Sequence, residues 1–402
     1  MKYVTILVDG MADYPIDELG GKTPLEAANI PATNDLARRG EVGMVRTVPE
    51  GMSPGSDVAN LALMGYEPEV YHTGRSPLEA ASMGVELSET DVAFRCNLVT
   101  LDGDGPFETR KMLDHSAGEI SNEEARQLIE MIDAELGKEG LRFYPGVSYR
   151  HLLVWEDGPY EFELTPPHDI LGQGISEYLP GGPHGPFLLD MTKKSLALLE
   201  DHQVNRGRIK RGLNPANSIW IWGEGKRPQL SPFKDRYGLK GAVISAVDLI
   251  FGIGILAGLD PIKVEGATGN IHTNFDGKAA AAVKALAGQT DYLYLHLEAP
   301  DECGHQGDLQ GKIRSMELID RKIVAPIISA LAASGEEYRI LIAPDHPTPI
   351  SLRTHVGEPV PYVLFDSRRQ TEAEQSFSEK SGRASGKFFM SGPELVAYYL
   401  SR

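Results

Sequence analysis

The chain of 402 residues is poor in cysteine and lacks an uninterrupted hydrophobic run of membrane-spanning length. Its two cysteines, Cys96 and Cys303, exclude a disulfide framework and argue against a cysteine-based metal site. The most apolar stretch, residues 241–259, is interrupted by Asp248 and several glycines, which favours a buried strand at 242–245 followed by a buried helix. The opening apolar run, residues 3–8, is too short for a signal peptide, so we expect no membrane attachment and a cytoplasmic location.

Basic residues are also too few to give the chain a positive field. Lysine and arginine total 39 against 57 aspartates and glutamates, and the formal net charge at pH 7 is -18. A protein that mainly binds nucleic acid needs a cationic surface, so this balance argues against that class of protein. It says less about small anionic ligands, because one pocket can be locally positive on an acidic protein. The hydrophobic content of 41% indicates a globular protein, and the oligomeric state stays open.

Short apolar runs alternate with helical patterns, which indicates an α/β fold. The runs that predict strands buried on both faces are residues 3–8, 218–222, 242–245, 292–297 and 338–343. Helical patterns lie between some of these runs, at residues 33–39, 277–286 and 313–331.

The middle of the chain has a different, mixed order of elements. It predicts helices at 122–137 and 193–201 and strands at 148–155 and 160–164. We therefore predict an α+β domain of residues 79–217, inserted into an α/β domain that is made of residues 1–78 and 218–402.

Three of the predicted strands lead into acidic and histidine side chains: Asp9, then Asp301 and His305, then Asp345 and His346, with His355 a short loop further on. The carboxyl ends of parallel strands meet at one edge of a sheet, where ligands bind. Carboxylate and imidazole together suit Mn²⁺ or Zn²⁺, and carboxylates can bridge two ions. Any single aspartate after a strand could equally be a turn or helix-cap residue rather than a metal ligand. The combined set of aspartates and histidines favours a metal site.

A candidate nucleophile lies at the start of a predicted helix. Residues 49–65 predict a loop that enters a helix, with Ser56 at the N-cap or in the first turn. A hydroxyl there faces free backbone N–H groups and the positive end of the helix dipole, which suits attack on a phosphate. A metal would lower the pKa of that hydroxyl and replace the missing general base. Serine is also a common helix cap, and Ser53 is the competing hydroxyl, although it precedes Pro54.

These residues belong to a series of short motifs that spans nearly the whole chain. The motifs are Asp9-Gly10, the segments 55–60, 74–80, 114–119 and 165–169, Asp301-x-x-x-His305, Asp345-His346 and Thr354-His355. In this order they resemble the archaeal-type cofactor-independent phosphoglycerate mutases, which belong to the alkaline phosphatase superfamily of two-metal enzymes. The resemblance implies an alkaline-phosphatase-like three-layer α/β/α core with an inserted α+β domain.

The resemblance also implies a role for each matching residue. One divalent ion would be held by Asp9, Ser56, Asp345 and His346, and the second by Asp301, His305 and His355. Ser56 would also be the nucleophile. The substrate would be bound by Arg75, His115, Arg150, His168 and Asp169, of which His115 and Asp169 would also act in catalysis. Lys240, just before the predicted strand at 242–245, could equally contact phosphate or flank that strand.

The implied reaction converts 3-phosphoglycerate to 2-phosphoglycerate through a phosphoserine, as part of glycolysis and gluconeogenesis. Two divalent ions, Mn²⁺ first and Zn²⁺, Mg²⁺ or Co²⁺ as alternatives, would take part, and 2,3-bisphosphoglycerate would not. The inserted domain would act as a lid that keeps water from the phosphoenzyme.

Three alternatives remain at this point. The first is a phosphatase or another phosphomutase, such as a phosphopentomutase. The second is a homoserine kinase role, for which the sequence shows no ATP-binding loop. The third is a metal-stabilised binding protein without catalysis, which the serine beside the metal set argues against.

Overall fold

The structure, a computed structural model, describes residues 1–103 and 105–401 and divides the chain into two compact units. Unit 1 comprises Met1–His72 and Gln229–Arg402, and unit 2 comprises Thr73–Pro228. The chain leaves unit 1 once and returns to it once. Unit 2 begins at Thr73 rather than at residue 79, and it ends at Pro228 rather than at residue 217.

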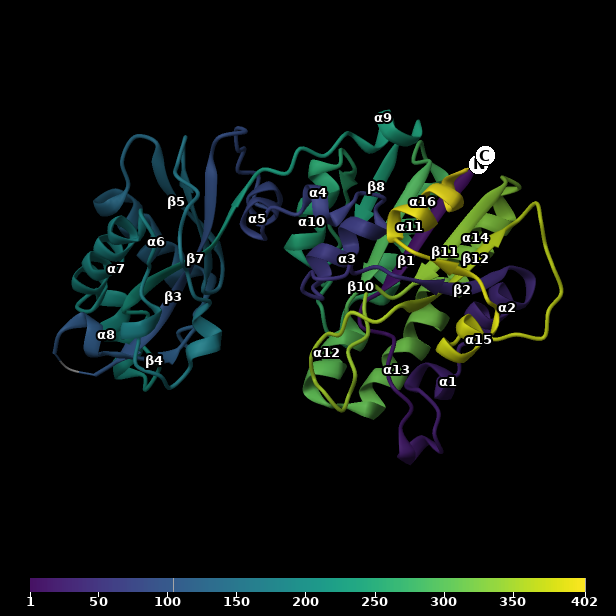
Figure 1. Cartoon of the computed structure of the whole chain (residues 1–402), viewed down its shortest axis with the longest axis horizontal. Helices are drawn as coiled ribbons and strands as arrows, with labels where there is room; N and C mark the ends of the chain where they lie inside the picture. The colour runs from purple at the N-terminus through teal and green to yellow at the C-terminus, as the bar shows by residue number, and fades with distance from the viewer. Residues whose placement is uncertain (104, 402) are drawn as a thin grey trace. The chain divides into compact units, whose positions relative to one another are not determined.

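Unit 1 is built on an eight-stranded sheet in the order β13-β2-β12-β11-β1-β10-β8-β9 (Figure 1). Strand β1 runs parallel to β10 and β11, and β10 runs parallel to β8, whereas β12 is antiparallel to β11 and β2. The strands are β1 (Lys2–Val8), β2 (Glu41–Val45), β8 (Gly241–Ile244), β9 (Asp260–Pro261), β10 (Tyr292–Leu297), β11 (Tyr338–Ala343), β12 (Val360–Asp366) and β13 (Phe388–Phe389).

The helices of unit 1 cover both faces of this sheet and give three layers. Val4, Ile6 and Val8 of β1 pack into one core with α11, α13 and α14. Tyr3, on the opposite face, contacts Tyr399 of α16 edge to face at 5.7 Å. A strand buried on both sides shows this alternation, and the predicted α/β class is confirmed.

The helices of unit 1 are α1 (Pro24–Ala27), α2 (Pro31–Arg39), α3 (Ser56–Leu63), α4 (Pro68–Tyr71), α9 (Phe233–Tyr237), α10 (Asp248–Leu256), α11 (Phe275–Ala287), α12 (Ala299–Gln306), α13 (Leu309–Ile319), α14 (Ala325–Ser334), α15 (Glu379–Ala384) and α16 (Gly392–Leu400). The predicted helix at 313–331 falls within α13, a π-helical turn (Asp320–Val324) and α14, which follow one another without a break. The strand and buried helix predicted at 241–259 are β8 and α10.

Unit 2 contains an antiparallel sheet of β3 (Val92–Asp102), β4 (Lys111–Asp114), β5 (Leu141–Val147), β6 (Arg150–Trp155) and β7 (Ser218–Lys226). Its helices are α5 (Ser76–Ser82), α6 (Asn122–Leu136), α7 (Gly185–Leu199) and α8 (Gln203–Lys210). Apolar residues of α6 and α7 share one core with alternate residues of β3, such as Phe94 and Leu98. The predicted α+β character of this segment therefore matches the structure.

Two of the predicted strands need correction. Residues 218–222 do form a strand, but β7 pairs antiparallel with β3 in unit 2 and is no part of the parallel sheet. It looks like a parallel strand because Ile219 and Ile221 enter one core of unit 2, whereas Trp220 enters another. Residues 160–164 form no strand among the described residues, and only Glu163 makes an isolated bridge, to Gly181.

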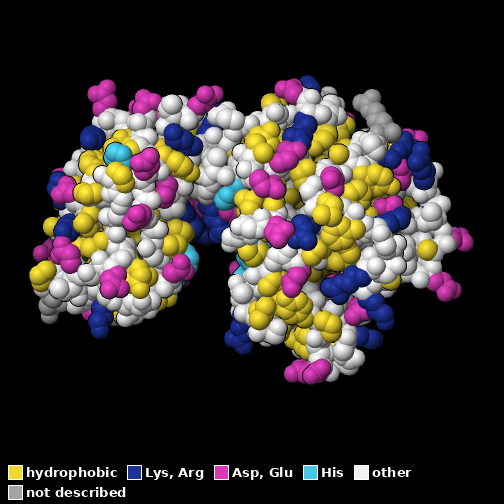
Figure 2. All heavy atoms as spheres, in the orientation of Figure 1, with side chains coloured by type: hydrophobic (Ala, Val, Ile, Leu, Met, Phe, Trp, Pro, Cys, Tyr) yellow, Lys and Arg dark blue, Asp and Glu magenta, His cyan; other side chains and the backbone are white. Residues whose placement is uncertain are grey.

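Charged side chains of both signs are spread over the visible face of each unit. Figure 2 shows Asp and Glu interspersed with Lys and Arg, so the acidic excess does not form one patch there. None of the helices that the structure describes is both long and apolar enough to cross a membrane.

The stability of unit 2 should depend on pH through His151, which lies in β6. Its side chain is buried, its Nδ1 accepts a hydrogen bond from Gly146 N at 3.0 Å, and burial lowers its pKa to about 3. In the unfolded chain a histidine takes up a proton near pH 6.5. Between about pH 6.5 and pH 3, unfolding therefore takes up a proton, and the stability contributed by the neutral ring falls as the pH falls.

We expect His151→Gln to flatten the dependence of the free energy of unfolding on pH in that window, by up to about 1.4 kcal/mol per pH unit. Urea titrations followed by tryptophan fluorescence measure it, because Trp155, Trp220 and Trp222 all lie in unit 2. The same substitution at the exposed His184 controls for the loss of a histidine. Identical slopes for wild type and His151→Gln would contradict the prediction.

Candidate active site

The carboxyl edge of the parallel strands brings together the three aspartates predicted as metal ligands. Asp9 directly follows β1, Asp345 follows β11 by one residue, and Asp301 lies in the first turn of α12, just after β10. Because β1 pairs with both β10 and β11, the three positions are neighbours. Gly10 permits the close approach, since its φ is +62° and a Cβ there would lie 2.6 Å from the Cα of Asp301.

The first group of side chains, here named the Asp9 group, consists of Asp9, Ser56, Asp345 and His346. Asp9, Asp345 and His346 are buried, and each offers a ligand atom within 4.8 Å of the others. His346 Nε2 lies 3.2 Å from Ser56 Oγ, 3.3 Å from Asp345 Oδ2 and 3.7 Å from Asp9 Oδ1. Ser56 is the first residue of α3, after Gly55 as N-cap, so it stands where a helix leaves backbone N–H groups free.

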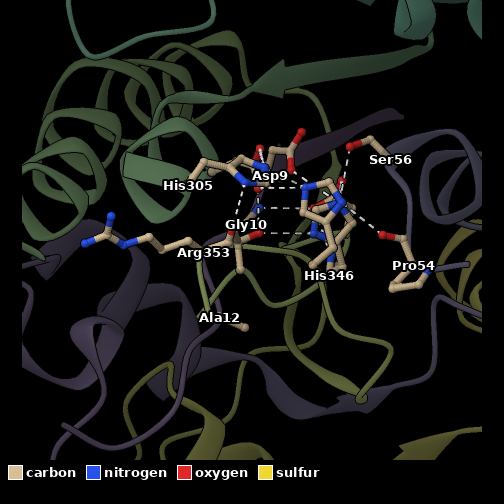
Figure 3. A network of polar contacts seen from close by, with 12 residues as sticks. Asp9, Gly10, Ala12, Pro54, Ser56, His305, His346 and Arg353 are labelled. Atoms are coloured by element: carbon tan, nitrogen blue, oxygen red, sulfur yellow. Dashed lines mark hydrogen bonds and ion pairs between the residues drawn. The ribbon is translucent and has the colours of Figure 1, made fainter. Parts of the chain in front are cut away.

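The second group, here named the Asp301 group, consists of Asp301, His305 and His355. Figure 3 labels His305 of this group together with Asp9, Ser56 and His346 of the Asp9 group. His305 Nε2 lies 3.2 Å from Asp301 Oδ2, and His355 Nε2 lies 3.4 Å from Asp301 Oδ1. The two Nε2 atoms are 2.9 Å apart. Asp301 and His355 also form a set with His346 in which the ligand atoms lie within 4.8 Å, so His346 stands between the two groups.

The ring nitrogens of the Asp301 group are oriented for metal binding. His305 Nδ1 lies 3.0 Å from the carbonyl oxygen of Arg353, and His355 Nδ1 lies 2.9 Å from that of Pro54. A carbonyl oxygen only accepts, so both Nδ1 atoms carry a proton, and in the neutral rings Nε2 keeps its lone pair. Hydrogen bonding to Asp301 raises the pKa of His305 to about 9, so a proton offsets the charge of Asp301 in the metal-free protein.

Electrostatics in the Asp9 group also fits a cation. Burial raises the pKa of Asp9 well above its ordinary value, and the charges of Asp345 and Asp301 raise it further. Asp9 Oδ1 is buried without a hydrogen-bond partner among the described residues. Burial raises the pKa of Asp301 as well, but hydrogen bonds from His305 and His355 outweigh it and hold that pKa far below its ordinary value. An orphaned oxygen among buried carboxylates and imidazoles is a setting that a divalent cation stabilises.

Sequence reasoning misses the residues that orient these groups. Asp345 Oδ2 accepts a hydrogen bond from Asn60 Nδ2 at 3.2 Å, and Asn60 Oδ1 accepts one from the Tyr294 hydroxyl at 2.7 Å. His296 Nε2 lies 3.0 Å from Asp9 Oδ2. Tyr294 and His296 are alternate residues of β10, so both side chains are on one face of the sheet. A histidine inside an otherwise apolar strand is the signal that could have revealed this layer.

A buried lysine joins the loops that follow β1 and β11. Lys312 Nζ donates to Asp13 Oδ2 at 2.7 Å, to Thr348 O at 2.8 Å and to Ala12 O at 3.3 Å. Ala12 and Asp13 follow Asp9 in the chain, and Thr348 follows His346. The side chain of Lys312 is fully buried. One ammonium group therefore fixes the spacing between the two loops that carry the Asp9 group.

Within unit 2, four of the residues predicted to bind substrate lie together: His115, Arg150, His168 and Asp169. The His168 ring is 6.1 Å from the His115 ring and 5.3 Å from Trp222, and His168 Nε2 lies 3.6 Å from Asp169 Oδ1. The His115 ring and the Arg150 guanidinium both lie against Tyr149, at 5.6 Å and 5.7 Å from its ring. The cluster combines proton carriers with a cation.

Arg75 is exposed and occupies the N-cap position of α5 in the same unit. Burial lowers the pKa of Arg95, and the charges of Arg75 and Arg150 lower it further, which places three cations within electrostatic range. Arg95 itself is engaged, since it forms two contacts with Glu79 at 3.0 and 3.2 Å and lies 4.4 Å from the Trp222 ring.

The structure corrects the prediction that Lys240 binds the substrate. It immediately precedes Gly241, the first residue of β8, and its Nζ lies 3.7 Å from Asp260. Because β8 runs parallel to β10, Lys240 is at the amino edge of the sheet, whereas the Asp9 and Asp301 groups are at the carboxyl edge. It flanks the strand and does not contact a ligand bound at these groups.

The sheet and its polar edge define a class: α/β enzymes whose reacting groups lie at the carboxyl ends of parallel strands. A model of the 2,3-bisphosphoglycerate-independent phosphoglycerate mutases matches residues 37–205. A protein of that name from Methanosarcina barkeri is 52% identical over 98% of both chains, and a probable one from Geobacter sulfurreducens is 52% identical over the whole of both. The chain belongs to the 2,3-bisphosphoglycerate-independent phosphoglycerate mutase family.

Two solved structures resemble the whole chain. The PH0037 protein from Pyrococcus horikoshii has a TM-score of 0.83 and 30% identity, with 99% of this chain and 96% of that chain covered. The cofactor-independent phosphoglycerate mutase from Thermoplasma acidophilum has a TM-score of 0.65 and 25% identity, with coverage of 99% and 98%.

We expect Lys312→Met to lower the free energy of unfolding by about 3–5 kcal/mol, because Asp13 then stays buried without its cation. Urea titration followed by far-UV circular dichroism measures the change. Lys322→Met is the matched control in unit 1, since Lys322 pairs at 2.6 Å with the exposed Asp276. We expect a change below about 1 kcal/mol there. Equal effects of the two substitutions would contradict the role of Lys312.

Proposed function

We propose that the chain interconverts 3-phosphoglycerate and 2-phosphoglycerate by passing the phosphoryl group through Ser56, without 2,3-bisphosphoglycerate. The place of Ser56 carries this proposal: its Oγ lies at the start of α3, 3.2 Å from His346 Nε2 and beside the buried carboxylates. The names of the relatives in Methanosarcina barkeri and Geobacter sulfurreducens agree with this reaction. We assign the reaction to glycolysis and gluconeogenesis in the cytoplasm.

In this proposal the Asp9 group holds one divalent cation and the Asp301 group holds the second. Mn²⁺ is the expected metal, with Zn²⁺, Mg²⁺ and Co²⁺ as alternatives. The orphaned Oδ1 of Asp9 and the inward lone pairs of His305 and His355 support the assignment. When bound, such cations neutralise phosphoryl charge and lower the pKa of a coordinated hydroxyl.

Unit 2 would supply the groups that bind glycerate. Arg75 and Arg150 offer planar forks that suit a carboxylate or a phosphate. His115 and Asp169, with His168 between them, would give and take the protons of the glycerate hydroxyls. Arg95 is already paired with Glu79, so we assign it to holding Trp222 beneath this cluster rather than to binding the substrate.

The reaction then consists of two mirrored phosphoryl transfers. In the first, Ser56 releases its hydroxyl proton to water, and its Oγ bonds to phosphorus while the bond from phosphorus to the 3-oxygen breaks. The 3-oxygen takes a proton from His115 or Asp169. Glycerate stays bound and turns. Its 2-hydroxyl gives its proton back to the same pair and bonds to phosphorus, which frees Ser56 Oγ to regain the proton it gave up. The free N–H groups at the start of α3 stabilise the negative charge on the phosphoserine.

Ser56→Ala should remove the mutase activity, by about 10⁴-fold or more, because no other hydroxyl takes over as nucleophile. The assay supplies 3-phosphoglycerate and Mn²⁺ without 2,3-bisphosphoglycerate, and ³¹P NMR follows 2-phosphoglycerate. Ser53→Ala is the matched control: Ser53 is an exposed hydroxyl of the same loop, and we expect near wild-type activity.

Other products would point to other functions. Release of inorganic phosphate in place of 2-phosphoglycerate would overturn the mutase proposal in favour of a phosphatase. Phosphorylation of homoserine by ATP would favour a kinase. A peptide containing Ser56 that gains one phosphoryl group after acid quenching would support the phosphoserine directly, and the same modification on Ser53 would contradict it.

A further inference from the structure

His296 is a buried histidine that the proposed reaction does not use. It lies in β10, is fully buried, and belongs to neither of the two ligand groups. Both of its ring nitrogens have a partner: Nε2 lies 3.0 Å from Asp9 Oδ2, and Nδ1 lies 3.2 Å from Ser245 Oγ. A buried imidazole with two fixed contacts, one of them to a site carboxylate, has a defined orientation.

The direction of these hydrogen bonds follows from the charge of Asp9 as a metal ligand, and a third contact is consistent with it. The backbone N–H of Val247 donates to Ser245 Oγ at 3.0 Å, which leaves the hydroxyl proton of Ser245 free to be donated. With Asp9 ionised, its Oδ2 can only accept, so the proton of the neutral ring sits on Nε2, and His296 Nδ1 accepts the hydroxyl proton of Ser245. A metal-bound carboxylate has no proton of its own, so it fits only this direction. A chain of hydrogen bonds therefore runs from the Val247 N–H through the Ser245 hydroxyl and the His296 ring to Asp9.

We propose that His296 is a positioning residue that selectively supports the metal site of the Asp9 group. Its hydrogen bond occupies Asp9 Oδ2 and thereby turns Oδ1, the buried oxygen without a partner, toward Asp345 and His346. Carboxylate ligands of metals are commonly held by such outer hydrogen bonds, and their loss costs about 10–100-fold in metal affinity. The inference rests on the proposed function, since it takes Asp9 to be a metal ligand.

The support is specific to one site. Among the described hydrogen bonds, His296 makes none with Asp301, His305 or His355. Asp301 has a separate outer partner, because the Thr348 hydroxyl donates to its Oδ1. A substitution of His296 should therefore weaken the binding of one of the two metal ions and leave the binding of the other unchanged.

The test is a Mn²⁺ titration of the metal-free, full-length protein by calorimetry, with electron paramagnetic resonance to separate isolated from paired Mn²⁺. We expect wild type to bind two ions. His296→Leu should bind one ion as wild type does and the second about 10–100-fold more weakly. His296→Gln keeps an N–H near the Nε2 position and should therefore lose less affinity for the second ion than His296→Leu does. At saturating Mn²⁺, His296→Leu should regain kcat, with an unchanged KM for 3-phosphoglycerate.

Ser245→Ala provides a second variant if His296→Leu does not fold. It should lower the affinity for the same ion by a smaller factor. The matched control is His151→Asn, which replaces a buried histidine of unit 2. This variant should bind both ions as wild type does. Unchanged binding in His296→Leu and Ser245→Ala, or equal weakening of both ions, overturns the inference alone. A wild-type protein that binds fewer than two ions overturns the metal assignment, and the inference with it.

Discussion

The repulsion among three buried carboxylates is the constraint on which the rest of the site depends. Asp9, Asp301 and Asp345 meet at adjacent strand ends, where burial removes the water that would screen their charges. Such a cluster persists in a fold only if protons, hydrogen bonds or cations offset it. The three carboxylates are offset differently: Asp345 by backbone N–H groups and Asn60, and Asp301 by two imidazoles and the Thr348 hydroxyl. Asp9 has a single side-chain hydrogen bond among the described residues.

This uneven compensation explains why the surrounding polar side chains are so deeply buried. Lys312, His296 and Tyr294 have no exposed side-chain surface, and each would be costly in a core without its partners. Each one fixes the position of a loop or of a carboxylate at the sheet edge. The parallel sheet supplies the coarse placement, because β1 lies between β10 and β11, and the buried polar residues supply the orientation.

The sequence reveals the acidic and histidine side chains at the strand ends but not the layer of residues behind them. Asp9, Asp301 and Asp345 can be found because strand endings are local patterns and because parallel strands converge at one edge. His296 and Lys312 act across nearly three hundred residues of sequence, so local patterns do not reveal their partners, although a histidine inside an apolar strand signals a buried polar contact. The same limit explains the errors: an apolar run does not say which sheet β7 joins, and proximity to a strand does not say at which edge Lys240 lies.

The acidic composition and an anionic substrate are compatible because charges gather locally: three buried aspartates lie at the sheet edge of unit 1, and three arginines lie near one another in unit 2. The buried aspartates of unit 1 are arranged so that one oxygen of Asp9 stays unsatisfied, which a cation could satisfy. In unit 2, Arg75, Arg95 and Arg150 lie within electrostatic range of one another, and Glu79 pairs with Arg95 in this group. A cation bound to the folded Asp9 group would stabilise it relative to the unfolded chain, which would couple metal binding to folding in unit 1.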